Sequence, residues 1–236
     1  MAAAWTQWEH VTKVDPDKAL HGGDSYAGIA DTGTDAIIIG GTTNVTEARV
    51  QPILDALSST EIPIFVELTY RPSSFHTESL SGYLLPIVLN ADDPLWITGA
   101  HHEWVRSSDL EWEAVHPEAY IVLNPASAVA TYTRADCDLD VDDVIAYAEL
   151  AEQVLGQQIV YLEYSGMLGD PAAVAATRDA LSSAQLFYGG GIHDYNSAYE
   201  MAGVADTVIV GDVLHDAGLK AVAETVRGAR DVHHDS

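Results

Sequence analysis

Eight short apolar runs, most of them separated by stretches with helical periodicity, constrain the fold of this chain more than any other feature. Alternating strands and helices over 236 residues are typical of a parallel sheet, and eight such units favour closure into a barrel. The predicted strands are Glu9–Asp15, Asp35–Gly40, Ile62–Leu68, Tyr83–Leu89, Ala119–Asn124, Gln158 into the segment Tyr161–Gly166, Gln185–Tyr188 and Thr207–Val210. We therefore expect an α/β fold, a (β/α)8 barrel that residues 1–236 form as a single domain. A doubly wound open sheet is the alternative, although its Gly-x-Gly-x-x-Gly motif is missing from the first unit.

Helical periodicity and capping residues indicate where the helices lie. Pro171–Leu181 has proline in its first turn after Asp170 as the cap, and Asn44 is the candidate cap of Val45–Leu57. The other predicted helices are Pro94–Arg106, starting at Asp93, and Asp142–Leu155, Tyr195–Met201 and Leu219–Val226. Thr69–Ser81 has no helical period, so an irregular crossover is expected there in place of a helix.

The charge balance is extreme, with 36 acidic residues, 10 basic residues and a formal net charge of −26. Such a chain repels the phosphates of nucleic acid, so nucleic acid is not expected as a partner. With 47% hydrophobic residues the chain can still form a large core. We therefore expect a folded, halophilic protein whose acidic shell suits a salt-rich cytoplasm. Binding in the cleft of a partner protein is the alternative explanation of the acidic surface.

Cysteine content and the chain ends indicate the same compartment. The single cysteine, Cys137, excludes an internal disulfide and fits a reducing cytosol. No run of about 18 apolar residues could span a membrane, and Met1–Trp5 lacks the basic start of a signal peptide. The expected location is cytoplasmic.

Glycines follow the last two predicted strands and predict an anion site. Gly189–Gly191 and Gly211 with Asp212 fall where (β/α)8 barrels commonly bind a phosphate. Glycine lets backbone amides approach an anion closely. A tight turn without a ligand is the alternative reading of the three consecutive glycines.

Glu163, near the end of the sixth strand, is the candidate general base. A carboxylate directed into a barrel mouth is costly unless it is paired or used, and this chain has few basic partners. Tyr161 and Tyr164 can donate hydrogen bonds or pack, and Ser165 can bind a phosphate or cap a turn. A structural ion pair is the alternative role for Glu163.

Lys13 and Asp15 alternate on the first strand and should face the same side. Lys13 is one of only three lysines, which favours a specific anionic partner. Asp15 is a candidate ligand for a hard cation, with Thr42 as a neutral oxygen partner, although Asp15 before Pro16 can equally cap a helix. His101, His102 and Glu103 have the wrong spacing for a zinc site.

These motifs together resemble the geranylgeranylglyceryl phosphate synthase family, which includes bacterial heptaprenylglyceryl phosphate synthases. The resemblance covers nearly the whole chain. It rests on Thr12–Asp17, Thr34–Thr42, Tyr161–Gly166, Tyr188–Ile192 and Ala205–Asp212. It implies a modified TIM barrel in which an irregular segment replaces the third helix.

The resemblance also implies an activity, the transfer of a geranylgeranyl group from its diphosphate to the C3 hydroxyl of sn-glycerol 1-phosphate with Mg²⁺. This is the first ether-bond step of archaeal membrane phospholipid biosynthesis, and the product can pass to a membrane. By position, magnesium would be held by Asp15 and Thr42, and Glu163 would be catalytic. Glycerol phosphate would contact Lys13, Tyr161, Leu162, Glu163, Tyr164, Ser165, Gly166, Gly191, Gly211 and Asp212. Asp212 stands where some members have asparagine, and the resemblance further suggests a homodimer.

The prenyl chain requires an apolar channel, for which Tyr83–Leu89 and Trp96–Trp104 are candidate walls. A non-helical backbone at Arg71–His76 is expected to border this groove. A phosphate-binding barrel isomerase or aldolase is the alternative function, and a phosphate- or prenyl-binding module without catalysis is a third.

Overall fold

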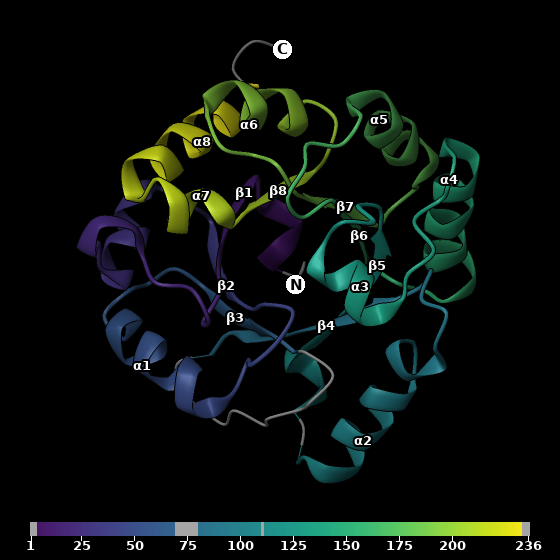
Figure 1. The fold of residues 1–236 in the computed structure, drawn as a ribbon, viewed down its shortest axis with the longest axis horizontal. Helices are drawn as coiled ribbons and strands as arrows, with labels where there is room; N and C mark the ends of the chain where they lie inside the picture. The colour runs from purple at the N-terminus through teal and green to yellow at the C-terminus, as the bar shows by residue number, and fades with distance from the viewer. Residues whose placement is uncertain (1–3, 69–79, 110, 233–236) are drawn as a thin grey trace.

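Eight parallel strands close into a barrel in which each strand pairs with its neighbours in sequence order, β1 through β8 and back to β1 (Figure 1). The computed structural model describes residues 4–68, 80–109 and 111–232. The strands are β1 His10–Val14, β2 Ala36–Ile39, β3 Ile64–Glu67, β4 Gly82–Val88, β5 Val115–Val122, β6 Ile159–Glu163, β7 Gln185–Gly189 and β8 Thr207–Val210. The predicted α/β barrel and all eight of its strands are therefore confirmed.

Most of the helices form a ring outside the barrel, whereas α3 lies inside that ring in this view, near β5 and β6 (Figure 1). They are α1 Glu47–Leu57, α2 Gly99–Ser107, α3 Ala128–Thr133, α4 Val141–Glu149, α5 Pro171–Ala180, α6 Tyr195–Ala202, α7 Asp212–Asp216 and α8 Leu219–Asp231. Short 3-10 helices are η1 Ala4–Gln7, η2 His21–Gly23, η3 Tyr26–Thr32, η4 Pro94–Trp96 and η5 Trp112–Ala114, and η6 Leu150–Val154 is a π-helical turn that continues α4. The Asp170 cap of α5 is confirmed, since its Oδ1 accepts the Ala172 N–H.

Successive side chains along each strand point to opposite faces of the barrel wall, and this divides the hydrophobic core into two layers. One layer lies inside the barrel and the other lies between the strands and the helices. At the N-terminal end of the barrel, Trp8 packs edge-on against Phe65, with ring centroids 5.2 Å apart, and lies beside Phe187. These rings fill the N-terminal end of the lumen, so polar side chains gather at the opposite end.

Two of the predicted helix starts are wrong. Helix α1 begins at Glu47, because Asn44 adopts a left-handed φ of 59° and donates its side-chain amide to Asp17. The predicted helix Pro94–Arg106 is two elements. Asp93 caps only the short η4 turn, and the backbone of Thr98, with φ −138°, separates that turn from α2.

Helix α3 is absent from the sequence-based prediction because its six residues are too short to show a helical period. Ser127 caps it by accepting the Ala130 N–H. The predicted irregular crossover at Thr69–Ser81, including the non-helical backbone at Arg71–His76, lies mostly outside the described residues.

Across the described part of the chain, no helix is both long enough and apolar enough to traverse a bilayer.

Candidate active site

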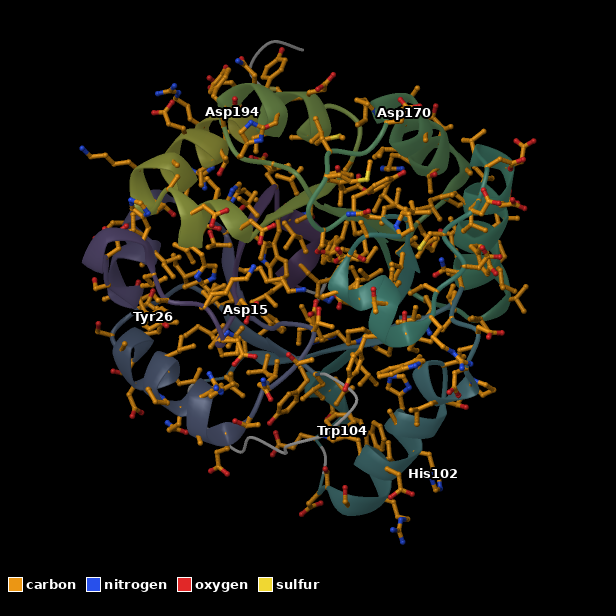
Figure 2. The ribbon with its side chains drawn as sticks, viewed as in Figure 1. Asp15, Tyr26, His102, Trp104, Asp170 and Asp194 are labelled. Atoms are coloured by element: carbon orange, nitrogen blue, oxygen red, sulfur yellow. The ribbon has the colours of Figure 1, made fainter. Side chains whose placement is uncertain are left out.

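A cavity of about 850 Å³ opens at the C-terminal ends of the strands and extends outward toward α2 and α3. The predicted residues Lys13, Asp15, Thr42 and Glu163 all line it, as do both glycine segments. In Figure 2 Asp15 lies over the barrel, Trp104 lies between α2 and the barrel, and His102 points outward from α2. The structure thus brings together residues from both ends of the chain.

Lys13 is held by a partner that the sequence did not reveal. Its Nζ lies 2.6 Å from Oε2 and 2.8 Å from Oε1 of Glu67, at the end of β3. The Tyr120 hydroxyl donates a short hydrogen bond to the same carboxylate. Burial acts to lower the pKa of Lys13, but Glu67 and Glu163 outweigh it and raise that pKa overall. Lys13 is therefore a fixed positive charge in the floor of the cavity.

Glu163 is 3% exposed and faces this lysine without a direct ion pair among the described contacts. Its Oε1 accepts the backbone N–H of Ser165 at 2.6 Å, which orients the carboxylate. Burial raises the pKa of Glu163, and Lys13 and Ser165 only partly offset that effect. A carboxylate with a raised pKa and an open side toward a cavity is suited to accept a proton.

Two stacked tyrosines form the wall beside Glu163. The rings of Tyr120 and Tyr161 lie 4.3 Å apart at an angle of 15°, and both are buried. The Tyr161 hydroxyl lies directly against Gly189, where a Cβ would come within 2.0 Å of it. Glycine at this position therefore makes room for the phenol.

The glycine corner is a tightly packed backbone turn. Gly190 and Gly191 have φ values of 138° and 64°, which favour glycine. A Cβ on Gly191 would lie 2.2 Å from the amide nitrogen of Leu168, so the two loops touch through their backbones. Gly211 follows β8 and lines the same cavity. Both predicted glycine segments therefore border the same cavity.

The Asp15 and Thr42 positions fit a hard cation. A Cβ on Gly41 would lie 2.9 Å from Oδ1 of Asp15, so the carboxylate lies against the backbone that leads into Thr42. Both residues are half-buried in the cavity wall. Within the described ranges, no group of three or more His, Cys, Asp or Glu residues is arranged to hold a metal. Oδ1 of Asp15 also accepts the backbone N–H of Asp17 at 2.9 Å and so closes a turn, which leaves Oδ2 and the Thr42 hydroxyl as the oxygens that could hold a cation. Magnesium needs only one or two protein oxygens when phosphates and water complete its shell.

Two of the predicted substrate-binding side chains point elsewhere. Leu162 is buried in the layer between strands and helices, and Tyr164 packs on that layer beside Tyr188. A ligand could reach these two residues only through their backbones. Tyr161, Glu163, Ser165 and Gly166 line the cavity as predicted.

The outer part of the cavity is apolar. Leu85 and Val88 of β4 line it together with Trp96, Ala100 and Trp104 in and around α2, while Val129 and Tyr132 come from α3. Trp96 and Tyr132 are in contact, with ring centroids 5.2 Å apart. The two candidate wall segments therefore meet in one apolar arm, and α3 supplies a third wall that the sequence did not predict.

The fold and the site together define a (β/α)8-barrel protein whose cavity joins a glycine-rich corner to an apolar arm. The profile of the PcrB family matches residues 3–228, and the chain belongs to this family. Over 232 residues the chain is 54% identical to the geranylgeranylglyceryl phosphate synthase of Natronomonas pharaonis, covering 98% of this chain and 99% of that protein. Over 218 residues it is 43% identical to the heptaprenylglyceryl phosphate synthase of Geobacillus kaustophilus, covering 92% and 90%.

Solved structures agree on the fold. The (S)-3-O-geranylgeranylglyceryl phosphate synthase of Thermoplasma acidophilum, in complex with its substrate sn-glycerol-1-phosphate, has a TM-score of 0.77 to this chain. The two chains are 23% identical, and the alignment covers 94% of this chain and 93% of that one.

Proposed function

We propose that this protein transfers a geranylgeranyl group from its diphosphate to the C3 hydroxyl of sn-glycerol 1-phosphate. The observation that carries the proposal is one cavity with two unlike ends. The glycine corner of β7 and β8 suits a phosphate, and the apolar arm around α2, α3 and β4 suits a hydrocarbon chain. Glu163 comes from β6, between these strands in the barrel order. Relatives at 54% and 43% identity carry names for this chemistry.

The chain's own residues bind and orient the acceptor. Backbone amides at Gly191 and Gly211 would hold the phosphate of glycerol phosphate and fix the position of its hydroxyls. The Glu163 carboxylate would accept the proton of the C3 hydroxyl as its oxygen attacks the allylic carbon of the prenyl group. The carbon–oxygen bond to diphosphate breaks, and diphosphate leaves with its electron pair.

Asp15 and Thr42 would hold Mg²⁺. The bound cation would neutralise charge on the diphosphate leaving group. Lys13, fixed by Glu67, supplies a positive charge in the same part of the cavity.

The isomerase or aldolase alternative is weaker at this site. An aldolase that forms a Schiff base needs a lysine free to lose its proton, whereas Lys13 is locked in an ion pair that raises its pKa. Neither an isomerase nor an aldolase acting on a small phosphorylated substrate would use the apolar arm.

One assay tests the proposal. Purified protein in KCl is supplied with sn-glycerol 1-phosphate, Mg²⁺ and radiolabelled geranylgeranyl diphosphate, and the butanol-extractable product is counted. Farnesyl and heptaprenyl diphosphates and sn-glycerol 3-phosphate are run in parallel. We expect turnover that needs Mg²⁺ and is highest for geranylgeranyl diphosphate and sn-glycerol 1-phosphate. No product with any of these combinations would overturn the proposal. A preference for heptaprenyl diphosphate would correct only the chain length.

A further inference from the structure

The cavity is strongly acidic for a site proposed to take two phosphorylated substrates. Within the described residues, its walls carry six acidic side chains and two lysines and no arginine: Asp15, Asp17, Glu67, Glu163, Asp212 and Asp216 against Lys13 and Lys18. Lys13 is already paired with Glu67. Lys18 is therefore the lysine that remains to compensate charge at the glycine corner.

Lys18 joins two parts of the site that are distant in sequence. It lies in the loop after β1, and its Nζ is 2.8 Å from Oδ1 of Asp212, the first residue of α7. The same Nζ lies 3.9 Å from Oδ2 of Asp15, the proposed metal ligand. Burial acts to lower the pKa of Lys18, but Asp212 and Asp15 outweigh it and raise that pKa overall.

A histidine fixes the loop on both sides of this lysine. Nε2 of His215 accepts the backbone N–H of Asp15 at 3.1 Å, and Nδ1 of the same ring donates to the carbonyl of Ala19 at 3.0 Å. His215 belongs to α7, as does Asp212. The loop is thus fixed on both sides of Lys18, and the ammonium group of Lys18 is held at Asp212, the residue after Gly211.

The negative charge of Asp212 is unfavourable for phosphate binding at this corner. It follows Gly211, where the acceptor phosphate is proposed to bind, and its side chain is 52% exposed toward the cavity mouth. An uncompensated carboxylate would repel a phosphate dianion. We propose that Lys18 is a substrate-positioning residue that cancels the charge of Asp212, so that this carboxylate does not repel the glycerol phosphate dianion. This inference rests on the proposed function.

The test compares Lys18→Met, Lys18→Arg, Asp212→Asn and the double variant Lys18→Met/Asp212→Asn. For each, kcat and KM for sn-glycerol 1-phosphate are measured at saturating prenyl diphosphate and Mg²⁺, with Tm as a separate readout. The KCl concentration is the lowest that keeps the wild type folded, because salt screens exposed charges.

We expect the two single variants to move KM in opposite directions. Lys18→Met should raise KM by about three- to tenfold, and Asp212→Asn should lower it. The double variant should lie near the wild type, Lys18→Arg should stay within about threefold of it, and kcat should change less than KM in each. Both single variants should lower Tm slightly, because each breaks the same ion pair. If both raise KM, or neither changes it, the pair is only a structural tie and the inference is overturned.

The Arg227–Glu224 pair on α8 is the matched control. Its side chains are 58% and 48% exposed, close to the 48% and 52% of Lys18 and Asp212, and neither residue lines the cavity. Arg227→Met and Glu224→Gln should leave KM unchanged.

Calorimetry separates this inference from the proposed function. If the wild type shows no turnover, the proposed function fails, and the Kd of sn-glycerol 1-phosphate or inorganic phosphate still tests Lys18. Opposite shifts of Kd in Lys18→Met and Asp212→Asn would support the inference. Parallel shifts, or no phosphate binding by the wild type, would overturn it.

Discussion

Inside the barrel one lysine faces three carboxyl groups, and their different surroundings give them different roles. Glu67 pairs with Lys13, while Glu163 opens to the cavity and accepts a backbone N–H. Glu118 is fully buried, and neither of its oxygens has a hydrogen-bond partner. Because Lys13 can balance only one negative charge, at least one neighbouring carboxyl group is best accommodated as the neutral acid.

Glu163→Gln tests the general base. It should lower kcat by about 10²- to 10⁴-fold while the Kd of glycerol phosphate stays within a few-fold, because the shape and the Ser165 contact are preserved. In the wild type kcat should rise with pH through the raised pKa of Glu163, since only the ionised carboxylate accepts a proton. Rapid kinetics and calorimetry measure both quantities, with the exposed Glu149→Gln as control. Activity near that of the wild type would remove Glu163 from the mechanism.

Glu118→Gln tests the neutral acid. Burial, with Glu67 adding to it, raises the pKa of Glu118 well above its usual range. The folded state therefore keeps a proton that the unfolded chain loses above pH ~4.3, so this residue costs stability increasingly as pH rises toward the folded pKa. The Gln variant has no such proton to lose. Its Tm relative to the wild type should therefore become more favourable between pH 5 and 8, as followed by calorimetry. A constant Tm difference across that range would mean that Glu118 does not titrate as inferred.

At the scale of elements, the π-helical turn η6 fastens the end of α4 to the loop between α5 and β7. Glu152 in this turn accepts backbone N–H groups from Ser182, Ser183 and Ala184, the last two at 2.6 and 2.7 Å. Partial burial acts to raise the pKa of Glu152, but these hydrogen bonds outweigh it and lower that pKa to about 2. A carboxylate with a lowered pKa stabilises the fold above its unfolded pKa and loses that effect as pH falls toward 2.

Glu152→Gln should therefore lower Tm at pH 7 by about 2–4 °C, because charge-assisted hydrogen bonds become neutral ones. The difference from the wild type should shrink as pH falls from about 4.5 toward 3. Glu149→Gln, in the last turn of α4, should change Tm little at either pH. An equal loss at pH 7 and pH 3 would show that shape and not charge matters at residue 152.

Local signals predicted the elements well, and tertiary contacts explain most of what they missed. Strand β8 matches its predicted bounds because an isolated run of β-branched residues leaves little choice of where the strand begins and ends. The Lys13–Glu67 and Lys18–Asp212 pairs span 54 and 194 residues, so only closure of the barrel brings their members together. Asn44 does not cap α1 because its side-chain amide donates a hydrogen bond to Asp17, 27 residues away. The single-domain organisation and the homodimer remain predictions.

For the whole molecule, the net charge of −26 is the dominant electrostatic feature. The described ion pairs are mostly exposed. Of the 10 basic residues, eight lie close to a carboxylate in the described part of the chain: Lys13, Lys18, Arg49, Arg106, Arg134, Arg178, Arg227 and Arg230. Most acidic residues therefore repel one another without a local partner of opposite charge. Self-repulsion of this kind destabilises the compact state, and dissolved salt relieves it.

Tm should accordingly rise with KCl, and most of the rise should come early. The screening length falls from about 10 Å at 0.1 M to ~3 Å at 1 M, which is close to the contact distance between two charged groups. Further salt therefore has little charge repulsion left to screen. Sulfate also strengthens apolar burial, and its stabilising effect should therefore continue to rise where that of KCl levels off. Calorimetry from 0.1 M upward in each salt measures both curves.

A double variant that removes two exposed charges, Asp142→Asn with Glu149→Gln, should have a Tm that depends less on KCl than the Tm of the wild type, since it has less repulsion to relieve. A Tm that does not change with KCl would show that repulsion within the acidic shell does not limit stability. It would favour the alternative explanation, in which the acidic surface binds in the cleft of a partner protein.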